Sequence, residues 1–145
     1  MLRDLWSPRT FGVVVCLLLL GGCASQQKLS DEQKSQLRER VEARWAALEA
    51  QDYDLAYTFM SPAYRDVFSA EMYGIQFSYM VERELTSVEI LNYDAPAAVA
   101  SVAVGVMSRP VKQTSAASAA IGAVPVVSVE QWIFRNKSWW YSVNR

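Results

Sequence analysis

The stretch EQWIFRNKSWWYSV, residues 130–143, predicts the closing hairpin of a β-meander and with it the fold class. Asn136 and Lys137 separate two runs of aromatic and β-branched residues, and asparagine tolerates the positive φ that a two-residue hairpin turn requires. We therefore expect a long strand over residues 124–135 and a closing strand over residues 139–143. Because neighbouring strand residues point to opposite faces, Trp139 and Trp140 should lie on opposite sides of the sheet.

Two more strands are expected upstream. Residues 85–93 form the first, residues 94–96 form a turn, and residues 98–108 are almost entirely valine and alanine. Such a continuous apolar run is typical of a strand covered on both faces. Residues 109–123 (RPVKQTSAASAAIGA) are rich in alanine and serine and are expected to form a flexible loop.

The residues before the strands have helical periodicity. Ser30 and Gln33 match the capping box that begins a helix. Apolar residues then recur at helical spacing, and they are Leu37, Val41, Trp45 and Leu48. Helices followed by an antiparallel meander indicate an α+β domain.

Three shorter helical segments are expected between this helix and the strands. One begins near residue 52 or 53 and ends before Pro62, because the residue preceding a proline is biased away from helical geometry. Pro62 can itself start another helical turn. A third helical stretch is predicted over residues 70–81, where apolar side chains are frequent.

The N-terminus has the pattern of an export signal. Arg3 and Arg9 precede the apolar run at residues 11–20, which ends in two glycines and Cys23. A membrane-spanning helix needs roughly 20 apolar residues, so this run is too short to cross a bilayer and suits the apolar region of a signal peptide.

Leu20-Gly21-Gly22-Cys23 resembles the bacterial lipobox. The resemblance implies that Cys23 carries a diacylglycerol, that residues 1–22 are removed, and that residues 23–30 hold the lipid and a tether for a domain at residues 31–145. Cys16 would be lost with the signal peptide, which leaves no disulfide. Ala24 and Ser25 lack the aspartate of inner-membrane lipoproteins, a pattern that implies an outer-membrane protein facing the periplasm.

Composition argues against several classes of function. The 14 basic and 15 acidic residues are nearly balanced and form no basic patch, so a nucleic-acid partner is not expected. The chain has no histidine and no cysteine or carboxylate spacing typical of a metal site. We expect neither a metal nor a cofactor.

RWAALEAQDYDLAYTFMSPAYR (residues 44–65) and the closing hairpin resemble the nuclear transport factor 2-like superfamily, which includes polyketide cyclases and ketosteroid isomerase. The resemblance implies a cone in which N-terminal helices pack on a strongly curved antiparallel meander. The chain departs from the family pattern because no clear short hairpin lies between the second and third helical stretches.

Active members of this superfamily carry acid or base groups in an apolar pocket, which suggests candidate residues here. The catalytic candidates are Tyr57, Asp54 and Glu130, with Asp66 as a further carboxylate. The candidates for contact with a ligand are Tyr57, Tyr64, Arg65, Glu130 and Trp132. Glu130 should share a face with Trp132 and Phe134, either towards solvent or inside the cone, and Arg65 is a possible ion-pair partner.

Three functions remain open from the sequence. The first is a non-catalytic, lipid-anchored binding or accessory module for an envelope protein or a small apolar ligand. The second is an isomerase or cyclase that uses a pocket carboxylate and a tyrosine. The third is a structural subunit of an envelope assembly. The lack of histidine and of a coherent acid–base pair favours the first.

Overall fold

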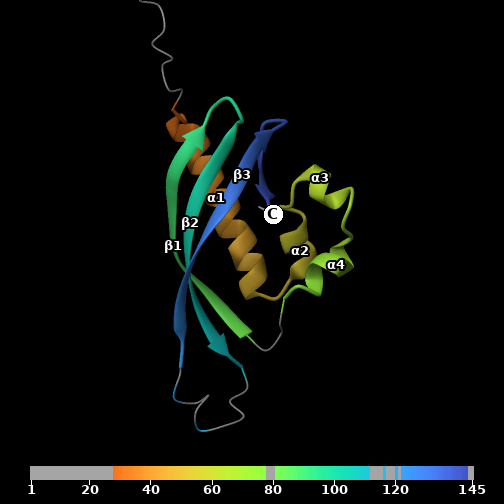
Figure 1. The fold of residues 1–145 in the computed structure, drawn as a ribbon, viewed down its shortest axis with the longest axis vertical. Helices are drawn as coiled ribbons and strands as arrows, with labels where there is room; N and C mark the ends of the chain where they lie inside the picture. The colour runs from red at the N-terminus through yellow and green to blue at the C-terminus, as the bar shows by residue number, and fades with distance from the viewer. Residues whose placement is uncertain (1–27, 78–80, 112–115, 117–119, 121, 144–145) are drawn as a thin grey trace, which may run out of the picture.

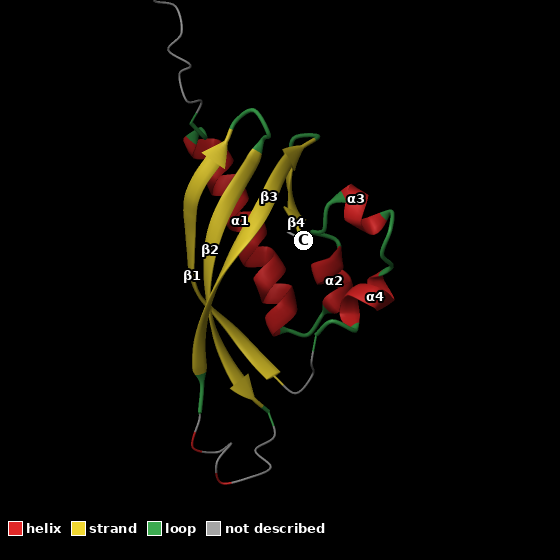
Figure 2. Cartoon of the chain, in the orientation of Figure 1, coloured by secondary structure: helices red, strands yellow, loops and turns green. Residues whose placement is uncertain are grey.

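Helices precede an antiparallel sheet in the computed structural model, which describes residues 28–77, 81–111, 116, 120 and 122–143. The sheet has the order β1-β2-β3-β4 (Figures 1 and 2). The named elements are α1 (Asp31–Glu49), α2 (Tyr53–Tyr57), α3 (Pro62–Arg65), α4 (Ala70–Gly74), β1 (Val81–Asp94), β2 (Val99–Pro110), β3 (Val124–Arg135) and β4 (Ser138–Ser142). This arrangement confirms the α+β class. The predicted signal peptide and Cys23 lie outside the described residues.

The capping box begins α1 as predicted. The Gln33 N–H donates to Ser30 Oγ and the Ser30 N–H donates to Gln33 Oε1, each at 3.1 Å. Leu29, just before the cap, is already buried. The apolar stripe of α1 is buried against the sheet, which α1 crosses on one face (Figure 2). None of the helices in the described part of the chain is long and apolar enough to cross a membrane.

The short helices match the sequence signals, except for the last. Asp52 caps α2, and Pro62 begins α3. The third predicted helical stretch is wrong in extent, because α4 ends at Gly74 and residue 81 begins β1. Val81 pairs with Pro110 at the far end of β2, so strand pairing outweighs the local helical periodicity there.

No hairpin lies between α2 and α4 in the described residues, in agreement with the departure noted in the sequence. The segment that follows α2 instead contacts β4 directly. Met60 forms a parallel bridge with Tyr141, and the Ser61 N–H donates to the Tyr141 carbonyl at 2.9 Å. The segment between α2 and α3 therefore attaches to the outer edge of β4.

Only one face of β2 is fully buried. Its buried positions alternate with half-buried ones, because the helices cover one side of the sheet. The prediction that this strand is covered on both faces is wrong. Small side chains such as Ala103 make the second face apolar without requiring another layer over it.

The β3–β4 turn has the predicted geometry. Asn136 and Lys137 have φ of 52° and 60°, and Arg135 pairs with Ser138 across the turn. Trp139 is completely buried while Trp140 is half-buried, which confirms that the two indoles point to opposite faces.

We expect Lys137→Gly to raise the free energy of unfolding by about 0.5 to 1 kcal/mol, because glycine removes the steric cost of positive φ. Urea denaturation would measure the change. The matched control is Lys34→Gly within α1, where the same substitution should lower stability by about 1 kcal/mol. A lower midpoint for Lys137→Gly would contradict the role assigned to this turn.

Candidate functional site

A buried ion pair joins α1 to β3 at the centre of the domain. Arg44 and Glu130 are each 4% exposed, and Arg44 Nη1 donates to Glu130 Oε1 at 2.8 Å. Two indoles complete the shell of the carboxylate. Trp45 Nε1 donates to Oε1 at 3.1 Å and Trp132 Nε1 donates to Oε2 at 2.9 Å. Both carboxylate oxygens therefore accept hydrogen bonds from buried donors.

Two tyrosines surround the guanidinium of Arg44. Its Nη2 donates to the Tyr73 hydroxyl at 3.4 Å, and its Cζ lies 3.9 Å from the centre of the Tyr141 ring. Burial disfavours the charge on Arg44, but the Glu130 carboxylate and the Tyr73 and Tyr141 hydroxyls together outweigh it and raise the pKa of Arg44. Arg44 thus stays a cation that neutralises Glu130 inside the core.

Burial also raises the pKa of the Tyr73 and Tyr141 hydroxyls, although Arg44 acts in the opposite direction. The unfolded chain should therefore release these protons first, at about pH 10. We expect stability to be unaffected by these groups below that pH and to fall above it, as the unfolded state gains from ionisation. Midpoints of urea denaturation measured between pH 8 and 11 test this expectation. Tyr73→Phe should make the fall in midpoint with rising pH shallower. An unchanged dependence of the midpoint on pH in Tyr73→Phe would contradict a contribution from this hydroxyl.

Tyr57 and Tyr64 contact the rim of this cluster rather than its carboxylate. Their rings lie 5.8 Å and 6.3 Å from the Tyr73 ring. The Tyr57 hydroxyl donates to the Phe68 carbonyl at 2.6 Å, which ties α2 to the segment before α4. The structure thus brings Glu130 and Trp132 into direct contact, and the rings of Tyr57 and Tyr64 lie against Tyr73 at the edge of the cluster.

Arg65 does not pair with Glu130, so that predicted ion pair is wrong. The partner is Arg44, because α1 crosses the sheet over β3 and α3 lies at the outer edge of β4. Arg65 instead lies with its Cζ 5.2 Å from the centre of the Trp140 ring. Asp66, next to it, is exposed.

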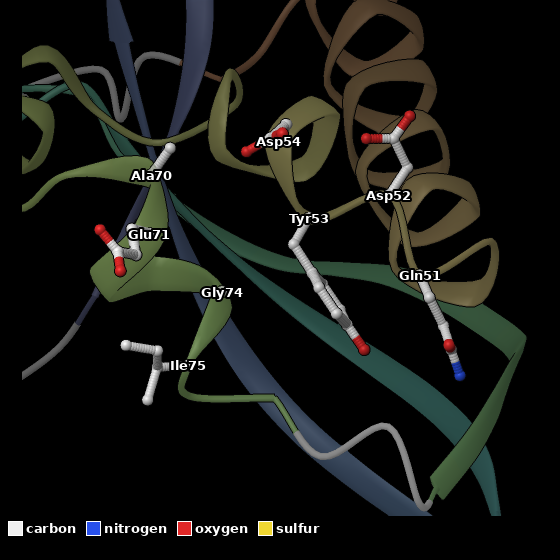
Figure 3. A pocket seen from close by; sticks show the side chains of 8 residues that line it. All are labelled: Gln51, Asp52, Tyr53, Asp54, Ala70, Glu71, Gly74 and Ile75. Atoms are coloured by element: carbon white, nitrogen blue, oxygen red, sulfur yellow. The ribbon is translucent and has the colours of Figure 1, made fainter.

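Asp54 lies on a different surface from Glu130. It lines an open hollow of about 340 Å³ together with Asp52 and Glu71, in a gap between α2 and α4 (Figure 3). The three carboxylates point in different directions and do not converge (Figure 3). Across the described ranges, no group of side chains is arranged to hold a metal ion.

Sequence reasoning missed Arg44, Tyr73 and Tyr141 as members of the central cluster. A signal for Arg44 was present, since it follows Val41 by three residues and precedes Leu48 by four, which places it on the buried stripe of α1. A charged residue on an apolar stripe indicates a buried partner. No comparable pattern marked the tyrosines.

Comparisons with known proteins reveal a similarity in fold and no match in sequence family. No protein-family model matches the chain, and no curated protein matches it. Among solved structures, it is similar to a protein of unknown function with a cystatin-like fold from Nostoc punctiforme, with a TM-score of 0.50 and 13% identity over 79% of this chain and 90% of that one.

Two further solved structures have lower scores. One is a SEC-C motif containing protein from Rhodopseudomonas palustris, with a TM-score of 0.43 and 15% identity over 72% of this chain and 73% of that one. The other is the association domain of CaMKII from C. elegans, with a TM-score of 0.41 and 16% identity over 77% and 95%. The structural likeness to the Nostoc protein supports a cystatin-like α+β fold and says nothing of activity.

Proposed function

We propose that this protein is a lipid-anchored lipoprotein of the bacterial envelope, held at the outer membrane and facing the periplasm. In this proposal its domain is a non-catalytic module that binds a partner protein. The lipobox at Cys23 supports the anchor. The arrangement of the central cluster, with Glu130 held by three donors, is the observation that carries the non-catalytic role.

A general base needs a lone pair directed at a substrate, and Glu130 offers none that is accessible. Its carboxylate is 4% exposed and is bonded to Arg44, Trp45 and Trp132. The Tyr57 hydroxyl is similarly engaged by a backbone carbonyl. These contacts support a structural role for Glu130 and Tyr57, and they give the isomerase or cyclase alternative less support than binding.

A strip of exposed valines at the start of β3 offers a contact surface for the partner. We call residues 124–129 the valine strand, and four of its side chains are exposed: Val124, Val126, Val127 and Val129. β4 pairs with β3 only from Gln131 to Arg135, so the valine strand has a free outer edge among the described elements. An apolar, unpaired edge favours addition of a strand from another protein.

The position of this surface suits an anchored protein. The valine strand lies at the end of the sheet opposite to the start of α1 (Figure 1). A lipid on the N-terminal side would therefore leave the valine strand directed away from the bilayer. The same surface would serve a structural subunit of an envelope assembly, which is the second candidate function.

The anchor is tested by Cys23→Ala in cells labelled with a palmitate analogue. We expect the label and the membrane-bound fraction of the protein to be lost together. A density gradient then distinguishes outer from inner membrane. Retention of the label in Cys23→Ala would overturn the proposal that Cys23 is the lipid attachment site.

The binding role is tested by a photocrosslinking residue placed at Val127, which is 73% exposed. The matched control is Val67, which is 69% exposed and lies outside the sheet. We expect a discrete crosslinked species from position 127 that is absent from position 67. Val127→Asp should reduce crosslinking from a probe at position 129. Equal crosslinking from positions 127 and 67 would contradict the proposal that the valine strand binds a partner protein.

A further inference from the structure

Two arginines from different helices meet beside one indole. Arg40 lies on α1 and Arg65 ends α3, and the Cζ of each lies 5.2 Å from the centre of the Trp140 ring. The two guanidinium carbons are thus at most twice that distance apart. Arg40 also lies 4.6 Å from the centre of the Phe59 ring. The aromatic rings hold both cations on the outer edge of β4.

Neither arginine has a counter-charge among the residues that the structure describes. The ion pairs in that part of the chain are those of Lys34 with Asp31 and of Arg44 with Glu130. Glu39 and Asp66, the acidic sequence neighbours of the two arginines, are exposed and do not pair with them. A pair of unneutralised cations is therefore built into this edge.

Several donors of the pair are available to a ligand. Arg40 Nε donates to the Trp139 carbonyl at 3.1 Å, which fixes the side chain, and its terminal nitrogens have no hydrogen-bond partner within the described ranges. Arg65 Nε is buried and likewise lacks a partner there. Because Arg65 Nε is closed to solvent, an incoming oxygen atom would reach the terminal nitrogens of the two arginines, which have no hydrogen-bond partner within the described ranges.

The electrostatics of the edge favour an anion. Burial lowers the pKa of Arg40, and the nearby charge of Arg65 lowers it further. The open hollow beside Arg40 has a volume of about 430 Å³ and is also lined by Lys137, Ser138 and Glu39. Arg40 and Lys137 supply two cations to this hollow against one carboxylate, while Arg65 and Trp140 do not line it. An anion bound between the two arginines would relieve their mutual repulsion.

We propose that Arg40 and Arg65, beside Trp140, form a binding site for a phosphate group carried by a soluble phosphoester or a lipid headgroup. Guanidinium groups bind phosphate through paired, charge-assisted hydrogen bonds. A tetrahedral phosphate presents oxygens in several directions, which suits two arginines that approach from separate helices. The site is independent of the valine strand and does not require the lipid anchor.

The test is a titration of the full-length, isotope-labelled chain in a neutral maltoside detergent with inorganic phosphate at constant ionic strength. We expect saturable NMR shifts of the Trp140 indole N–H, assigned with Trp140→Phe, and of the Arg65 Nε–H. Arg40→Gln and Arg65→Gln should each weaken binding at least tenfold. Arg109→Gln, which removes an exposed arginine of β2, is the matched control and should leave binding unchanged.

Additional measurements identify the source of the phosphate, and a control variant distinguishes a lost contact from misfolding. Stronger binding of micelle-borne phosphatidylglycerol than of glycerol phosphate assigns the lipid source, and the reverse assigns the soluble one. Arg65→Lys keeps the charge and should retain part of the binding, which separates a lost contact from a lost fold. Three results would overturn the proposal. They are the absence of a saturable shift at tens of millimolar phosphate, shifts in Arg40→Gln and Arg65→Gln as large as those of the unmodified chain, and binding of acetate that is tighter than binding of phosphate.

Discussion

Glu130→Gln should lower the free energy of unfolding by about 3 kcal/mol or more, because it leaves the Arg44 cation buried without a counter-charge. Arg44 is 4% exposed, so water cannot replace the lost carboxylate charge. The amide also cannot accept from all three donors that now reach the carboxylate, since one of its ends is itself a donor. Urea denaturation followed by circular dichroism would measure the loss.

A double-mutant cycle separates the ion pair from its surroundings. Arg44→Met alone should also destabilise, because it leaves Glu130 buried as an uncompensated anion. The combined Arg44→Met, Glu130→Gln variant should lose much less than the sum of the two single changes. Glu89→Gln, on an exposed position of β1, is the matched control for a lost carboxylate. A Glu130→Gln midpoint equal to that of Glu89→Gln would show that the pair is not a core element.

The two completely buried indoles of the sheet should respond very differently to the same substitution. Trp132→Phe is expected to cost about 3 kcal/mol, because it removes volume and also the donor to Glu130 Oε2. Trp139→Phe is expected to cost about 1 kcal/mol. Its Nε1 has no hydrogen-bond partner in the described part of the chain, and a phenyl ring keeps much of the packing against Phe134.

Each tryptophan variant serves as the control for the other, since both remove the same atoms from fully buried sites. Thermal or urea unfolding under identical conditions gives the difference directly. A smaller loss for Trp132→Phe than for Trp139→Phe would contradict the hydrogen-bond network drawn around Glu130. The loss of unfolding free energy in the combined Trp132→Phe, Glu130→Gln variant should be smaller than the sum of the two single losses, because both substitutions act on the same carboxylate.

The closing hairpin was predictable because its signals are local. Asn136 and Lys137 specify a two-residue turn, and alternation along β3 places Glu130 and Trp132 on one face. The capping box at Ser30 likewise depends on residues only three positions apart. The helical prediction over residues 70–81 failed where a long-range contact decides the outcome, since β1 extends to pair with the far end of β2.

The partner of Glu130 was not predictable in the same way. Alternation indicates which face of β3 carries the carboxylate but not which helix crosses that face. That depends on how α1 lies on the curved sheet, which the packing of the apolar stripe determines. Arg65 is nearer to Glu130 in sequence than Arg44, yet it ends a short helix on the far side of β4.

The separation of 86 residues between Arg44 and Glu130 has a consequence for biosynthesis. At roughly 5 to 20 residues per second, Glu130 is made about 4 to 17 s after Arg44. During that interval α1 carries an unneutralised arginine on an apolar stripe that has no β3 or β4 to cover it. The nascent chain is therefore an expected client of chaperones until the closing hairpin has been synthesised, and only then can its core assemble.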